Sequence, residues 1–162
     1  MEIICKKREV LNKMGLVELA YCWTHQRREF INIKTKYQDL NGWADSWIKT
    51  IGEIYHINNE RMKHKPESEQ FRRNTELLRG KIKDMEKLIN EKYIHPGQIE
   101  IMESMKRHWK GLTLFVDSPE IPMDNNKAER MLRKVVLGRK NFYGNHSNWA
   151  CELSMAMYSV IS

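Results

Sequence analysis

Apolar side chains recur at helical spacing over most of the chain. From residue 43 to residue 62 they fall three or four positions apart, which places them on one face of an α-helix. The same spacing returns over residues 77–89 and over residues 101–112. The pattern predicts three amphipathic helices, with core positions Trp43, Trp47, Ile51, Ile54, Tyr55 and Met62; Leu77, Leu78, Ile82, Met85, Leu88 and Ile89; and Ile101, Met102, Met105, Trp109 and Leu112.

One stretch has a different character. Residues 16–22 form a short apolar run after Gly15, with the length and residue types of a buried strand, although a helix is also compatible with it. Pro96-Gly97 separates two of the predicted helices, and residues 117–122 break the chain again with two prolines. We therefore expect a mainly α-helical protein with one or at most two short strands, and a final helix from about Trp149.

The composition fits one domain with a basic surface. The chain has 162 residues, of which 41% are hydrophobic, and 28 Lys and Arg against 21 Asp and Glu give a net charge of +7. A basic balance favours a polyanionic partner such as nucleic acid. Residues 60–92, which include Arg61, mix both signs of charge, a pattern typical of a solvated helix face.

The cysteines and the hydropathy bear on the compartment. Three widely spaced cysteines are an odd number and argue against a disulfide framework. No run approaches the ~18 apolar residues of a membrane span, and the N-terminus carries charges where a signal sequence would be apolar. We expect a cytoplasmic protein with no membrane partner.

A single acidic residue, Glu129, lies inside the basic stretch of residues 123–133, MDNNKAERMLR. Apolar residues from Ala128 to Val136 make one helix face, and Gly138 is a natural stop after it. With Asn126 as N-cap, Glu129 occupies the position at which a glutamate closes a capping box. Spacing alone favours this capping role, and a role as a metal ligand is the alternative.

The basic residues of this region also have two interpretations. Lys127, Arg130 and Lys134 point away from the apolar face, and Arg139-Lys140 follow with Phe142 and Tyr143 beside them. A phosphate backbone would bind such an edge, and bases can stack on the aromatic rings. A solvated basic face with both aromatic residues in the core is equally compatible.

From Cys22 onward, over about residues 16–162, the chain resembles the transposases of the insertion sequence 66 family. One motif, CWTHQRREF at residues 22–30, is similar to the family's Cys-Trp-Ala-His-x-Arg-Arg-x-Phe. The second is a long block whose matching parts are HPGQ at 95–98, HWKGLT at 108–113, IPMDNN at 121–126, Ala128-Glu129-Arg130, Arg133, and GRKNFYG at 138–144.

The resemblance implies a DDE-type catalytic domain with a ribonuclease H-like α/β fold, which cleaves and joins DNA at transposon ends. Such domains use two aspartates and a glutamate to hold two Mg²⁺ or Mn²⁺ ions, since hard oxygen ligands suit these metals. Glu129 corresponds to the third carboxylate and is the expected catalytic residue and metal ligand. The expected DNA contacts are Arg27, Arg28, Arg130, Arg133, Arg139 and Lys140.

The resemblance also implies a division of the chain. Residues 1–24 correspond to a remnant of the ribonuclease H-like core, residues 25–122 to a helical insertion, and residues 123–162 to the core helices that carry the Glu129 motif. In the family both catalytic aspartates precede the Cys-Trp motif, whereas residues 1–38 contain no aspartate. We therefore expect a transposase fragment, truncated at both ends, whose metal cage is incomplete.

Such a fragment is expected to be inactive alone and to bind no metal ion by itself, with retained DNA binding as a further hypothesis. The alternative is a non-catalytic helical interaction protein that pairs with or inhibits an intact transposase, and a third option is a fragment with no present role. A strand at residues 16–22 without its sheet would leave open edges and favour self-association.

Overall fold

The structure is a computed structural model that describes residues 19–126, together with residues 130, 149, 152 and 153. The chain divides into two compact units, Met1–Asp124 and Asn125–Ser162, and nearly all described residues lie in the first. Glu129 and most of its predicted helix lie outside the described residues. Trp149, Glu152 and Leu153 are helical, as expected for a final helix from about Trp149.

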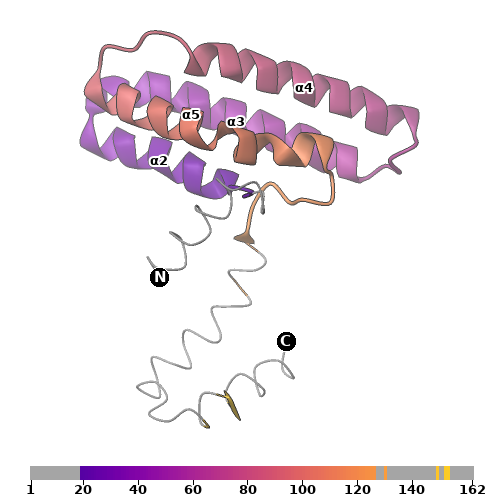
Figure 1. The fold of residues 1–162 in the computed structure, drawn as a ribbon. Coiled ribbons are helices and arrows are strands. Elements are labelled where there is room, and N and C mark those ends of the chain that lie inside the picture. The colour runs from indigo at the N-terminus through magenta and orange to yellow at the C-terminus, as the bar shows by residue number, and fades with distance from the viewer. Residues whose placement is uncertain (1–18, 127–129, 131–148, 150–151, 154–162) are drawn as a thin grey trace. The chain divides into compact units, whose positions relative to one another are not determined.

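The first unit contains a bundle of four helices (Figure 1). Short connections join them, so successive helices run antiparallel, and α2 also contacts α5, which closes the bundle. The elements in chain order are α2 (Trp23–Lys36), the short 3₁₀ helix η1 (Gln38–Leu40), α3 (Asn41–Met62), α4 (Glu69–Ile89) and α5 (Pro96–Asp117). Within the described part of the chain, no helix combines the length and the apolar character that a membrane span requires.

The three helices predicted from apolar spacing are confirmed, and so is the mainly α-helical class. The apolar segments at 43–62, 77–89 and 101–112 lie within α3, α4 and α5. Local signals mark two of the starts: Ser68 Oγ accepts a hydrogen bond from Phe71 N at the start of α4, and Pro96 opens α5. The starts of α4 and α5 therefore follow from the sequence nearby, whereas no described side chain caps the start of α2 or of α3.

The predicted strand is wrong in its described part. Residues 19–22 are neither helix nor strand. Tyr21 N donates to Gly111 O of α5 at 3.1 Å, so this backbone binds a helix instead of a neighbouring strand. The expectation of self-association through an open strand edge loses its basis for these residues.

All four helices contribute to one core. Phe30 of α2 stacks on Trp47 of α3, with ring centroids 5.4 Å apart and an interplanar angle of 12°. Helices α2 and α5 approach closely at Gly97, where an added Cβ would lie 2.8 Å from Ile33 Cδ1, so a larger residue would have to shift that side chain. The largest apolar side chains with almost no exposure are Trp23, Phe30, Phe115, Ile51, Ile54, Leu78, Met85, Ile89, Met102, Met105 and Leu112.

Some individual positions differ from the sequence prediction. Met62, Leu77 and Leu88, expected in the core, are exposed. Arg61, expected on a solvated face, is fully buried. Helical spacing gives the average direction of a face but not its width, which depends on the packing of neighbouring helices.

Candidate functional site

The structure describes only some of the residues predicted to act on DNA. Arg27 and Arg28 lie on α2 with exposed side chains, and Arg130 is helical and exposed. Glu129, Arg133, Arg139 and Lys140 lie outside the described residues. The predicted DNA contacts and the predicted metal ligand therefore remain predictions.

Within the first unit, the structure brings together two motifs that are far apart in the sequence. Trp23 N, at the start of α2, donates to Met123 O at 3.0 Å. The indole Nε1 of Trp23 donates to Leu112 O of α5 at 2.7 Å, and the Trp23 side chain is fully buried. The Met123 side chain is also buried. The Cys-Trp motif thus holds the chain just before the Glu129 motif.

A polar cluster adjoins this junction. Thr24 Oγ1 of α2 lies 3.2 Å from the hydroxyl of Tyr55 on α3. Tyr55 and Asp124 line one pocket of about 400 Å³, whose wall also includes Asn58, Asn59, Met62 and the loop residues Pro119, Glu120, Ile121, Pro122 and Met123. Burial raises the pKa of Tyr55 to about 12, and the negative charge of Asp124 acts in the same direction, while the hydrogen bond with Thr24 opposes it.

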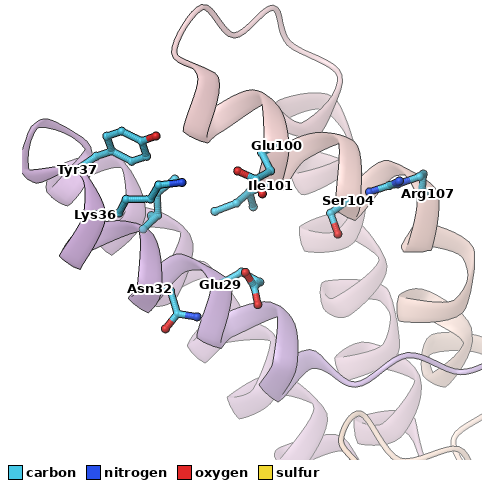
Figure 2. Close-up of a pocket in the computed structure, with 9 residues that line it drawn as sticks. Glu29, Asn32, Lys36, Tyr37, Glu100, Ile101, Ser104 and Arg107 are labelled. Carbon is cyan, nitrogen blue, oxygen red and sulfur yellow. The ribbon is translucent and has the colours of Figure 1, made fainter. Parts of the chain in front are cut away.

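A second pocket, of about 240 Å³, lies between α2 and α5 (Figure 2). Glu29 and Lys36 line it from α2, and Glu100 and Arg107 line it from α5. Asn32 and Ser104 add neutral polar groups to its wall. Because its two carboxylates and two cations balance, the pocket has no net charge to select an anion or a metal ion.

The described aspartates do not assemble a metal site. No group of three or more His, Cys, Asp or Glu side chains that could hold a metal ion occurs among the described residues. The described carboxylates therefore do not fit a two-metal centre. Three of the aspartates instead pair with basic side chains at separate places on the bundle: Asp45 with Lys34, Asp84 with Lys87, and Asp117 with Arg79. Asp39 lies 3.6 Å from His95 Nε2, a contact that is an ion pair only when the histidine is protonated.

The two motifs were predicted from the sequence. The two pockets and the contact between the motifs were not. Thr24, Tyr55 and Asp124 come from α2, α3 and the loop after α5, and no local spacing relates them. The one available signal was the presence of both motifs in a single chain, which does not say that they touch.

Comparison with known proteins gives the family. The model of the family described as "Transposase IS66 family" matches residues 9–153. Two proteins of Sinorhizobium fredii (strain NBRC 101917 / NGR234) are similar to this chain, and both are named only as uncharacterized. Protein y4jD is 30% identical over 139 residues, which cover 80% of this chain and 26% of that protein. Protein y4hP is 26% identical over 160 residues, which cover 90% and 29%.

The chain therefore spans less than a third of the length of these relatives. No solved structure matches the chain. Because the family model covers most of the sequence, including both motifs that meet at Trp23 and Met123, the chain belongs to the IS66 family of transposases.

Proposed function

We propose that this chain is a part of a DDE-type transposase, which supplies the third catalytic carboxylate, Glu129, and the helical insertion that precedes it. Family membership over residues 9–153 carries the proposal. In this proposal the bundle of α2 to α5, from Trp23 to Asp117, makes up most of the insertion assigned to residues 25–122. Residues 1–24 and 123–162 are then the parts that belong to a ribonuclease H-like core.

If the chain is such a part of a transposase, catalysis requires further metal-binding carboxylates from outside this chain. In this class of enzyme two divalent metal ions stabilise the attacking and leaving oxygens. Residues 1–38 have no aspartate, and three of the five aspartates of the chain pair with Lys or Arg side chains spread over the bundle. The chain alone is inactive in this proposal, and its Glu129 acts only beside two aspartates of a larger transposase.

The activity test uses labelled transposon-end DNA with Mg²⁺ or Mn²⁺. The expected result is no nicking and no strand transfer by the chain alone. If the chain alone nicks the DNA and the Glu129→Ala variant does not, the expected inactivity is wrong. The chain would then complete its own metal site. In an intact family transposase, Glu replacement at the matching position should abolish cleavage, and full activity there would overturn the role of Glu129.

DNA binding is placed by this proposal on the C-terminal part of the chain. Residues 19–126 carry 18 Lys and Arg against 16 Asp and Glu, a net charge of +2, and one of these cations, Arg61, is buried. Residues 127–162 carry six against two, a net charge of +4 over a much shorter segment. Phosphate contacts follow local positive charge, which favours Arg130, Arg133, Arg139 and Lys140 over the surface of the bundle.

The binding test compares two variants with the same number of removed charges. One replaces Arg133, Arg139 and Lys140 by alanine, and the control replaces the exposed Arg72, Arg73 and Lys83 of α4. Each lost phosphate contact lowers the slope of log affinity against log salt by about 0.9. In the first variant the steepness of this salt dependence should therefore fall by about 2 to 3. In the control it should stay close to that of the unmodified protein. A DNA affinity that does not depend on salt concentration would contradict the proposal. So would a larger loss of salt dependence in the control than in the first variant.

A non-catalytic role as an interaction protein is the second candidate. The nearly neutral bundle and its exposed apolar side chains, among them Ile94 at 87% and Leu77 at 53% exposure, favour this role. It predicts a stable complex with an intact transposase and weak DNA affinity. Size-exclusion chromatography of the mixture tests it, and separate elution of the two proteins at micromolar concentration would exclude it.

A further inference from the structure

We infer that Tyr55 is a positioning residue, whose hydroxyl accepts a hydrogen bond from Thr24 and donates one to Asp124, so that the start of the Glu129-bearing segment is held against the Cys-Trp motif. This inference rests on the proposed role of Glu129 for its functional meaning. The hydrogen-bonded junction itself involves only residues of the first unit.

The geometry brings the three side chains to one place. Thr24 Oγ1 and the Tyr55 hydroxyl are 3.2 Å apart. Tyr55 and Asp124 share the wall of the same pocket. The backbone bond from Trp23 N to Met123 O fixes the residue before Asp124 beside the residue before Thr24. The backbone bond at Met123 and the inferred side-chain bond at Asp124 would therefore act on neighbouring residues of the same loop.

The direction of the hydrogen bonds follows from the chemistry of the groups. An ionised carboxylate only accepts hydrogen bonds, and a tyrosine hydroxyl has one proton. If Tyr55 donates its proton to Asp124, the Thr24 hydroxyl must be the donor to Tyr55. The influences on the pKa of Tyr55 have the matching signs, since burial and Asp124 raise it and Thr24 lowers it.

The backbone bond at Met123 and the side-chain bond through Tyr55 together constrain the loop more than either bond alone. The Trp23 to Met123 bond fixes one point on the loop through the backbone. In this proposal, a second connection through Tyr55 adds a side-chain constraint on Asp124, the last residue of the first unit. Misplacement of about 1 Å in a catalytic group has large effects on rate, so such a double attachment suits a segment that carries a metal ligand.

The test measures amide hydrogen exchange by mass spectrometry in the full chain. Tyr55→Phe removes only the hydroxyl, and Tyr93→Phe is its control, because the Tyr93 hydroxyl donates to Leu88 O at 2.8 Å at the other end of the bundle. Tyr55→Phe should increase exchange of the peptide covering residues 122–126 about tenfold, with unchanged exchange in α4. The control should leave residues 122–126 unchanged.

Thr24 provides the second variant and the rescue. Thr24→Val removes the donor to Tyr55 but keeps the bond from Tyr55 to Asp124, so it should increase exchange at 122–126 less than Tyr55→Phe does. Thr24→Ser, which keeps the hydroxyl, should restore protection. A tyrosine titration followed by NMR gives a readout that a purely structural role would not move. Asp124→Asn should lower the pKa of Tyr55 and Thr24→Val should raise it.

Unchanged exchange at residues 122–126 in Tyr55→Phe, or shifts of the Tyr55 pKa in the same direction in both variants, would overturn the inference. These measurements use neither DNA nor metal. A failure of the DNA and cleavage tests therefore removes the proposed function and leaves the junction intact, whereas unchanged exchange removes the positioning role alone.

Discussion

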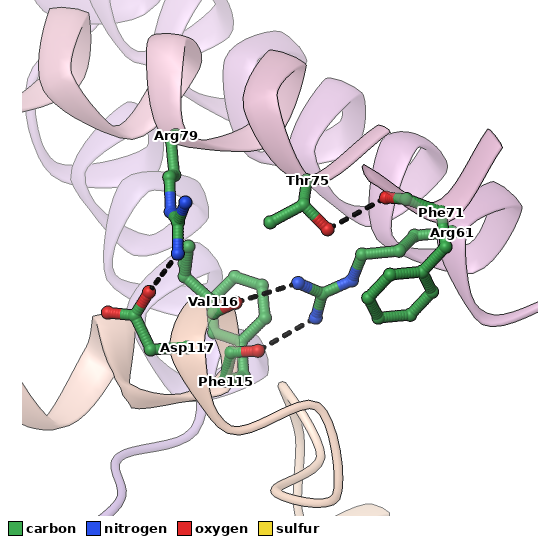
Figure 3. A network of polar contacts seen from close by, with 7 residues as sticks. All are labelled: Arg61, Phe71, Thr75, Arg79, Phe115, Val116 and Asp117. Atoms are coloured by element: carbon green, nitrogen blue, oxygen red, sulfur yellow. Dashed lines mark hydrogen bonds and ion pairs between the residues drawn. The ribbon is translucent and has the colours of Figure 1, made fainter. Parts of the chain in front are cut away.

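Arg61 donates a hydrogen bond from Nη1 to the carbonyl oxygen of Val116 at 2.8 Å, inside the bundle and with no solvent exposure (Figure 3). Its Nη2 donates to Phe115 O at 2.7 Å. Both carbonyls belong to the last turn of α5, where they lack partners within the helix. This turn has no basic residue of its own, so α3 supplies the cation that complements the negative end of the α5 dipole.

Replacement of Arg61 should destabilise the bundle strongly. Arg61→Ala leaves two carbonyls without their donors and opens a cavity, and we expect a loss of about 3 kcal/mol in the free energy of unfolding. Arg61→Lys should lose about 1 to 3 kcal/mol, because an ammonium group lacks the planar fork that reaches both oxygens. Urea denaturation followed by circular dichroism measures both.

The control for Arg61 is Arg79→Ala. Arg79 pairs with Asp117 at 2.7 Å in the same region, but both side chains are more than half exposed. Exposed ion pairs contribute roughly 0 to 1 kcal/mol. If Arg79→Ala is as damaging as Arg61→Ala, the buried capping role of Arg61 is wrong.

Two glycine substitutions should have opposite effects on stability. A Cβ at Gly111 would lie 2.2 Å from Leu19 O and 2.4 Å from Tyr21 Cδ2, so Gly111→Ala should displace the segment before α2 and lose about 1 to 3 kcal/mol. Gly52 lies within α3 with nothing within 4 Å of an added Cβ. Gly52→Ala should gain about 0.5 to 1 kcal/mol, since alanine favours the helix. Thermal melting of both variants checks the signs, and a stabilising Gly111→Ala would contradict the packing of residues 19–21 on α5.

The indole of Trp23 offers a test of the junction between the motifs. Trp23→Phe keeps an aromatic ring but removes the donor to Leu112 O, and a buried carbonyl without its partner loses about 1 to 3 kcal/mol. Trp109→Phe is the control, because that ring packs edge-on against Trp23 with centroids 6.1 Å apart. Guanidinium denaturation should show the larger loss for Trp23→Phe, and equal losses would mean that ring volume and not the hydrogen bond matters.

Much of the fold was predictable because helical periodicity is a local property. Ile51, Ile54 and Met85 lie in the core as their spacing predicts. Residues 19–22 were not predictable, since a short apolar run does not reveal that its backbone partner is a helix carbonyl. Arg61 was misplaced for a related reason. The residues that follow it, among them Lys63 and Lys65, are exposed, and only the tertiary contact with the end of α5 explains its burial.

The candidate site was predictable only in its parts. The motif around Trp23 and the motif around Asp124 are visible in the sequence, and family membership supports both. Tyr55 was assigned to a core stripe because of its helical spacing, and it is indeed half-buried. Its hydroxyl chemistry depends on Thr24, which another helix supplies, so no pattern within residues 43–62 could indicate it.

The raised pKa of Tyr55 predicts a specific loss of stability at high pH. The pKa of about 12 exceeds the ordinary value of 10.0 for an unfolded tyrosine, so the fold favours the neutral phenol. Its contribution is complete below pH 10 and is lost as the pH rises from 10 to about 12. Two pH units correspond to at most about 2.7 kcal/mol, and partial exposure of the ring reduces this to about 1 to 2 kcal/mol.

Urea denaturation at pH 9, 10 and 11 measures this loss. The free energy of unfolding should fall more steeply with pH for the unmodified protein than for Tyr55→Phe, which has no phenolic proton to lose. Because other groups titrate equally in both proteins, identical slopes would mean that the Tyr55 hydroxyl is not held in the neutral form by the fold.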